Sequence, residues 1–165
     1  MSKKFDKLMA EAAEVVNAPA SPNLAAAVTK VLADGFVFYF KAHSFHWNVV
    51  GKDFPQLHDF FGKVYEGVFD GVDRLAEEIR ALDAMAPKNL SSLVSAASIS
   101  ENTADLDGMG MVSALAEDNQ KILAGLLACQ KLSEAANQVG LANYLQDLYD
   151  SHKKLAWMFN SILKG

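Results

Sequence analysis

The sequence has little of several features that would indicate other classes of protein. One cysteine among 165 residues means that no disulfide can form within the chain, and a reducing compartment is expected. That residue, Cys129, fits a small buried side chain on a helix. Positive charge is not in excess, because the formal net charge is −5 and the pI is near 5.3. This balance disfavours a broad nucleic-acid-binding surface.

Long apolar runs are also missing. Residues 1–7 lack the apolar stretch of a signal peptide. The most apolar run, residues 36–40, is too short to cross a bilayer and closely follows Asp34. We therefore expect a soluble, cytoplasmic protein with no membrane partner. Hydrophobic residues make up 51% of the chain, which at this length predicts one packed domain over residues 1–165.

Helical periodicity organises what is present. An amphipathic segment over residues 5–16 comes first. Long helices are then predicted at about 22–49, 55–82, 111–137 and 141–163, with a short helix at 90–97 in a crossover over 88–110. Their starts and turns are indicated by Pro22, Pro55, Gly51 and Gly140. Two long helices, a long crossover and two more helices predict an all-α, ferritin-like four-helix bundle.

Apolar spacing and helix-interior glycines indicate how these helices pack. The candidate core positions are Leu24, Val28, Val31, Leu32, Leu115, Ile122, Leu126 and Leu127. Glycines at 62, 67 and 71 each cost the second helix up to about 1 kcal/mol relative to alanine, which indicates a packing purpose. Gly67 and Gly71 share a face, which fits either a close crossing between subunits or packing within the bundle.

Four side chains of the first helix pair are of the types that bind redox-active iron: His46, His58, Asp73 and Glu77. His58 and Asp73 lie on one predicted helix, roughly 22 Å apart at 1.5 Å rise per residue. They therefore cannot bind the same metal ion within one subunit. A second copy of this helix, antiparallel across a twofold axis, would bring the carboxylates of one chain to the histidines of the other. The sequence predicts a metal site that forms only in an oligomer.

These residues also carry a family resemblance. His46-Trp47, Phe54, Leu57-His58, Asp73 and Ala76-Glu77 together resemble the signature of the Dps family, the dodecameric miniferritins. Further matches over residues 22–163 are Asp118, Lys154 and the run Trp157-Met158-Phe159. The resemblance implies a shell of twelve subunits that oxidises Fe(II), preferentially with hydrogen peroxide, and stores ferric mineral inside.

The resemblance also implies a role for each site residue. His46 and His58 would bind iron from one subunit, and Asp73 and Glu77 from its partner, so these four would be both the metal ligands and the catalytic residues. Glu77 would be the principal carboxylate of a site for one or two iron ions. Trp47 would either intercept stray oxidising equivalents or simply pack.

The chain departs from the family pattern near this site. Many Dps proteins have an aspartate one turn after the second histidine, where this chain has Gly62, so a second iron ion is expected to bind weakly or transiently. Asp59 points about 100° from His58 and Glu66 lies two turns on, so neither is a clear replacement. His43 could add a nitrogen ligand, but a structural or solvated role is the stronger expectation.

Pore residues and tails also differ. Val139, Asn143 and Glu134 align with acidic pore positions of the family, and Asp147 and Asp150 follow, so the uptake route is expected to be less acidic or shifted. The few terminal lysines, Lys3, Lys4, Lys7 and Lys164, predict weak or absent DNA binding.

Other functions remain alternatives to the ferroxidase. One is a DNA-coating structural shell whose metal site has decayed. Another is a shell that binds zinc at the same ligands without redox work, since His, Asp and Glu also bind zinc. A di-iron site inside one bundle needs Glu-x-x-His pairs, and no histidine of the sequence has a glutamate three residues before it.

Overall fold

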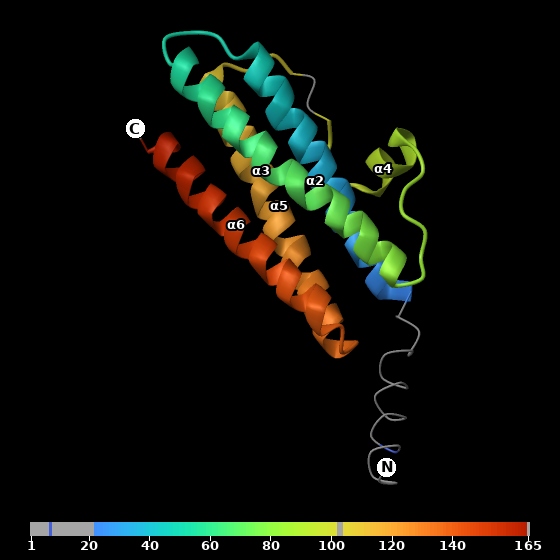
Figure 1. Cartoon of the computed structure of the whole chain (residues 1–165). Coiled ribbons are helices and arrows are strands. Elements are labelled where there is room, and N and C mark those ends of the chain that lie inside the picture. Colours follow the sequence, from blue (N-terminus) through green and yellow to red (C-terminus); the bar gives the residue numbers. More distant parts are fainter. Residues whose placement is uncertain (1–6, 8–21, 102–103, 165) are drawn as a thin grey trace.

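The structure is a computed structural model that describes residues 7, 22–101 and 104–164. The amphipathic segment predicted at 5–16 lies outside these residues, apart from position 7. Within residues 22–101 and 104–164 the helices are α2 (Pro22–Asn48), α3 (Phe54–Ala81), α4 (Leu90–Ala96), α5 (Gly108–Ala135) and α6 (Val139–Leu163), labelled in Figure 1. No strand occurs in the described part of the chain. The predicted all-α ferritin-like bundle is confirmed, including the short helix in its crossover.

The four long helices pack as two antiparallel pairs. α2 packs on α3 and α5 packs on α6, while contacts between α2 and α5 join the pairs. α4 lies outside the bundle beside α2 (Figure 1). The crossover that carries α4 is fastened by the buried carboxylate of Asp34, which accepts hydrogen bonds from the backbone N–H of Ser98 (2.5 Å) and Ile99 (3.1 Å).

Two helices are followed by a turn that uses no glycine. Two residues after the ends of α3 and α5, Asp83 (φ 60°) and Asn137 (φ 55°) lie in the left-handed region. The residue after each closes the turn on a carbonyl five positions back, as in a Schellman motif: Ala84 bonds to Ile79 O at 3.2 Å. Gly140 was predicted to mark the α5–α6 turn, but it lies inside the first turn of α6.

The core confirms all but one of the predicted positions. Leu127 is 41% exposed, because it lies about 100° round the helix from the buried Leu126.

By length and composition alone, α2 from Asn23 to Asn48 is apolar enough to cross a membrane. Half of that window is buried inside the bundle, as expected of a core helix, so this is weak support for a membrane span.

His152 on α6 gives the bundle a titratable group in its interior. Its Nδ1 lies 2.6 Å from Oδ1 of Asn119 on α5, whose side-chain amide donates to the His152 carbonyl at 2.9 Å. Burial lowers the pKa of His152 from 6.5 to about 4. The unfolded chain therefore binds the proton more readily, and stability is lost as pH falls from about 6.5 to about 4.

We expect this one group to contribute about 3 kcal/mol of that pH dependence. The measurement is urea unfolding at several pH values for the wild-type chain and for His152→Gln, whose amide does not titrate. The difference in unfolding free energy between the two proteins should change by that amount across the window. A difference that stays constant with pH would contradict a neutral, buried His152.

Candidate metal centre

His46, near the end of α2, and His58, near the start of α3, hold each other in place. Nδ1 of His46 lies 2.7 Å from the carbonyl oxygen of His58, and Nδ1 of His58 lies 2.8 Å from the carbonyl oxygen of His46. The two rings stack with their centroids 3.7 Å apart and 23° between their planes. A carbonyl oxygen only accepts hydrogen bonds, so each Nδ1 carries a proton, and in the neutral form of either ring the lone pair is on Nε2.

This arrangement is suited to metal binding. Histidines that bind metals usually donate their other ring N–H to a carbonyl or carboxylate, which fixes the tautomer and the orientation of the ring. Here backbone carbonyls accept from both rings, because the turn that joins α2 to α3 brings the two histidines together. Gly51 lies in that turn at φ +110°, a conformation that other residues rarely adopt. The pair therefore presents two nitrogen ligands before any metal binds.

Asp73 and Glu77 lie far from these histidines within the chain. α3 is unbroken from Phe54 to Ala81, so His58 and Asp73 are roughly 22 Å apart along it. Both carboxylates are exposed, and their neighbours Arg74 and Glu78 pair with each other at 3.7 Å. Among the described residues of one chain, no group of three or more His, Cys, Asp or Glu side chains could hold a metal ion. The four candidate ligands are thus brought together only in pairs.

Gly67 and Gly71 lie on α3 between the two pairs of candidate ligands. Gly67 is exposed and has no atom within 4 Å of the place where a Cβ would lie, but at 100° per residue it lies about 180° round the helix from His58. Gly71, by contrast, faces α6, where a Cβ would lie 3.2 Å from Leu148. The two glycines therefore serve different purposes: Gly71 allows close packing within the bundle, and Gly67 leaves space outside it.

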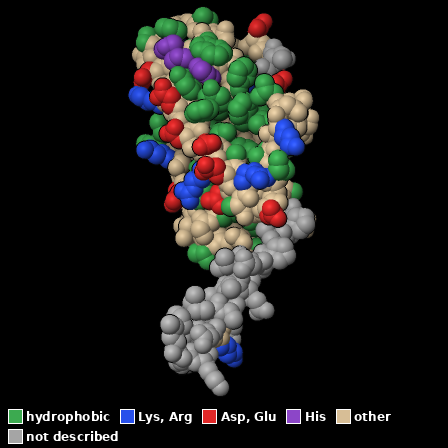
Figure 2. Space-filling view, turned by 45° about the vertical axis from the view of Figure 1, so that its right-hand side comes forward, with side chains coloured by type: hydrophobic (Ala, Val, Ile, Leu, Met, Phe, Trp, Pro, Cys, Tyr) green, Lys and Arg blue, Asp and Glu red, His purple; other side chains and the backbone are tan. Residues whose placement is uncertain are grey.

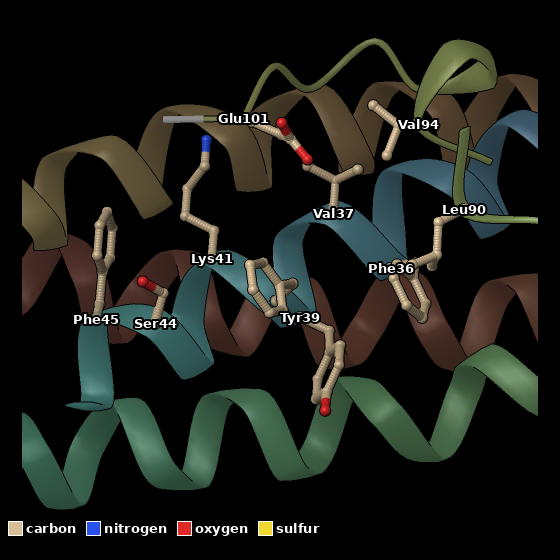
Figure 3. A pocket seen from close by; sticks show the side chains of 10 residues that line it. Phe36, Val37, Tyr39, Lys41, Ser44, Phe45, Leu90, Val94 and Glu101 are labelled. Atoms are coloured by element: carbon tan, nitrogen blue, oxygen red, sulfur yellow. The ribbon is translucent and has the colours of Figure 1, made fainter. Parts of the chain in front are cut away.

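Exposed aromatic side chains lie on the face formed by α2 and α3. Phe40, Trp47 and Phe69 on α2 and α3 are 51%, 56% and 53% exposed. Figure 2 shows histidine gathered at one end of this face beside apolar side chains, with acidic side chains further along it. Next to it, α2 and the crossover enclose a pocket of about 510 Å³, seen in Figure 3. Its lining is mostly apolar and includes Phe36, Phe40, Phe45, Leu90 and Val94.

Gly62 lies directly beside the histidine pair. A Cβ at this position would lie 3.4 Å from Nδ1 and 3.5 Å from Cε1 of His46. Asp59 does not take its place, because its carboxylate is paired with Lys63 at 2.6 Å and both side chains are exposed. The one face where a further carboxylate would meet the histidines therefore carries no side chain.

His43 packs among aromatic rings. Its ring stacks on Tyr65 at 4.0 Å between centroids and lies 4.1 Å from Trp47, while His46 is 6.2 Å away. The sequence favoured a structural or solvated role for His43 over that of a ligand, but sequence reasoning missed Tyr39 and Tyr65 as its neighbours. The available signals were the four-residue spacing from Tyr39 to His43 and the seven-residue spacing from His58 to Tyr65, each of which places two residues on one face.

Comparison with known proteins places this chain. The profile of the ferritin-like domain family matches residues 25–165. The crystal structure of Dps from Vibrio cholerae O1, described as a member of a broad superfamily of ferritin-like diiron-carboxylate proteins, is similar with a TM-score of 0.82. Its identity is 31%, over 86% of this chain and 89% of that one.

Two curated relatives are similar at lower identity. The DNA protection during starvation protein of Brevibacillus brevis is 28% identical over 86% of this chain and 95% of its own length. An uncharacterized low temperature-induced protein of Nostoc is 28% identical over 81% of this chain and 76% of its own length. With the bundle, its crossover helix and these matches together, the chain belongs to the Dps family of ferritin-like proteins.

Proposed function

We propose that this protein is an iron-storage and detoxification miniferritin that oxidises Fe(II), preferentially with hydrogen peroxide, at sites shared by twofold-related subunits of a twelve-subunit shell. The observation that carries the proposal is the reciprocal His46–His58 pair, which offers two nitrogen ligands with no third ligand nearby among the residues that the structure describes. A partner's carboxylates would complete the site.

Each ligand type has a task in this chemistry. The two imidazoles bind Fe(II), and the harder carboxylate oxygens of Asp73 and Glu77 from the second subunit stabilise the Fe(III) product. Positions left open on the iron accept peroxide, which is reduced to water or hydroxide as iron is oxidised. Ferric ions then leave the site and collect as mineral within the shell. Because Gly62 supplies no carboxylate, we infer that one iron ion binds tightly at each site.

The test is an anaerobic Fe(II) titration followed by stoichiometric hydrogen peroxide. Ferric absorbance should rise rapidly in the wild type, and the iron should co-elute with a large assembly in gel filtration. Glu77→Gln should lose most of this activity, while Glu117→Gln, a matched change of an exposed carboxylate on α5, should not. Slow oxidation that is equal in wild type and Glu77→Gln would contradict the ferroxidase.

Zinc binding without redox work is the second candidate, because His and carboxylate ligands also suit Zn²⁺. It would be favoured if the wild type bound zinc at one ion per subunit, lost it on His58→Ala, and oxidised iron no faster than that variant. In that case the shell would store or buffer zinc, and the same four residues would be its ligands.

DNA binding is expected to be weak at physiological salt, since the chain carries a net charge of −5 and few clustered lysines in its described part. A mobility-shift titration with linear duplex DNA should show little retardation in salt of about 150 mM, where the Debye length is about 8 Å. Tight, salt-sensitive retardation would instead support the DNA-coating alternative.

A further inference from the structure

Beside the candidate iron ligands, a continuous set of aromatic rings leads away from His46. Tyr65 packs edge-on against His46, with 5.4 Å between ring centroids. The other neighbours of Tyr65 are His43, stacked at 4.0 Å, and Tyr39, edge-on at 6.2 Å. Neighbouring rings from the iron site to Tyr39 are therefore close enough to exchange an electron.

Tyr39 differs from Tyr65 in having a base for its proton. Its hydroxyl lies 3.4 Å from Nδ1 of His43, and the pair is half-buried. Figure 3 shows Tyr39 turned from α2 toward α3, the helix that carries Tyr65. The Tyr39 hydroxyl donates this hydrogen bond when Nδ1 of His43 is the acceptor. Phe69 covers the other side of the Tyr39 ring at 5.0 Å.

This pairing matters for oxidation chemistry. A phenol keeps its proton at neutral pH and becomes strongly acidic once it loses an electron. It is therefore oxidised readily only when a nearby base takes the proton in the same step. A neutral imidazole is well suited, because its own proton affinity lies near physiological pH.

An electron supplied by Tyr39 would have a use at the iron site. Reduction of hydrogen peroxide to hydroxide takes two electrons, and one Fe(II) supplies one. With Gly62 beside the histidines, the site lacks the carboxylate that would help to hold a second iron. We propose that Tyr39 supplies the second electron, and that His43 holds the tyrosine's proton while it is oxidised. The proposal rests on the proposed ferroxidase and deepens it.

The two steps balance. In the first, Fe(II) reduces H₂O₂ to HO⁻ and a bound hydroxyl radical. Tyr39 then gives that radical an electron through Tyr65, which converts it to a second HO⁻, and the Tyr39 hydroxyl gives its proton to His43. The products of this step are Fe(III), two HO⁻, a Tyr39 phenoxyl radical and protonated His43. In the second, another Fe(II) reduces the phenoxyl radical, which takes its proton back from His43. The sum is two Fe(II) and one H₂O₂ giving two Fe(III) and two HO⁻, with no free hydroxyl radical.

The first experiment needs no metal. Metal-free protein is oxidised by photogenerated tris(bipyridyl)ruthenium(III), and tyrosyl radical is followed by transient absorption and electron paramagnetic resonance. Tyr39→Phe should lose most of the radical formed on the fast time scale. His43→Gln should slow its formation roughly 100-fold, the usual weight of a general base, and abolish the solvent deuterium isotope effect. Tyr149→Phe, which changes a tyrosine on α6 outside the ring set, should match the wild type.

The second experiment loads one Fe(II) per subunit and adds hydrogen peroxide. The wild type should show a tyrosyl signal in freeze-quenched samples and little hydroxyl radical in a spin trap, and Tyr39→Phe should reverse that partition. Full radical yield in metal-free Tyr39→Phe, or an unchanged rate and isotope effect in His43→Gln, would overturn the proposal. Absence of ferric product in the wild type would instead contradict the ferroxidase, and the metal-free experiment would then decide the role of the pair alone.

Discussion

His58→Ala is expected to slow formation of ferric product by at least about 100-fold, because it removes one of the two nitrogens that hold Fe(II). The change removes the ring that stacks on His46 but keeps the hydrogen bond that orients it. The bond that orients His46 runs to the backbone carbonyl of residue 58, which alanine retains. The bundle and the His46 ring should therefore stay in place, and the loss should be one of metal binding alone.

The measurement is stopped-flow ferric absorbance after peroxide addition, with Fe(II) binding measured anaerobically in parallel. Asn48→Ala is a suitable control, since this exposed residue ends α2, the helix that carries His46, and its side chain donates to Ser44 on the same helix. Circular dichroism and gel filtration should be unchanged in both variants. If His58→Ala oxidised iron at the wild-type rate, the histidine pair would not be the iron site.

Gly62→Asp is expected to raise the number of tightly bound iron ions from one to two per site. The added side chain would start 3.4 Å from Nδ1 of His46, an ordinary contact that needs no rearrangement. Its carboxylate would give a second ion an anionic oxygen ligand next to the first. We expect the second ion to bind at least about tenfold more tightly than in the wild type.

Anaerobic isothermal titration with Fe(II) measures this directly, and Gly62→Asn is the matched control because it adds the same bulk without the charge. With two electrons available from paired iron, peroxide consumption should also become faster in Gly62→Asp and less dependent on Tyr39. Two tight ions already present in the wild type would show that another group replaces the missing carboxylate. Two Fe(II) ions would then supply both electrons, and peroxide reduction would need none from Tyr39.

The bundle could be predicted from sequence because its signals are local and repeated. Apolar residues at helical spacing, together with Pro22 and Pro55, gave each long helix to within a few residues. The ends were harder to place. α5 begins at Gly108, ahead of the predicted start, because the Asp107 side chain caps it by accepting from Gly110 N at 2.8 Å. It ends at Ala135, and Asn137 in the turn that follows has a conformation for which glycine is the usual signal.

The candidate site could be predicted from the sequence only in part. Residue types and helical rise are enough to separate His58 from Asp73 and so to predict a shared site. The reciprocal bonds between His46 and His58 depend on where two backbone carbonyls lie across a turn, which no sequence pattern specifies. The ring contacts of His43 likewise depend on the register of α2 against α3, which is set by packing over both helices.

The central claim is that each iron site is completed by a second subunit, and subunit mixing tests it most directly. His58→Ala and Glu77→Gln chains, each inactive alone, are unfolded together, reassembled at equal amounts and assayed for iron oxidation with peroxide. In a mixed twofold pair, one site has both changes and the other has neither. Random pairing should therefore restore about a quarter of the wild-type activity. Activity no greater than that of either variant alone would show that histidines and carboxylates must come from one chain, and would contradict the account.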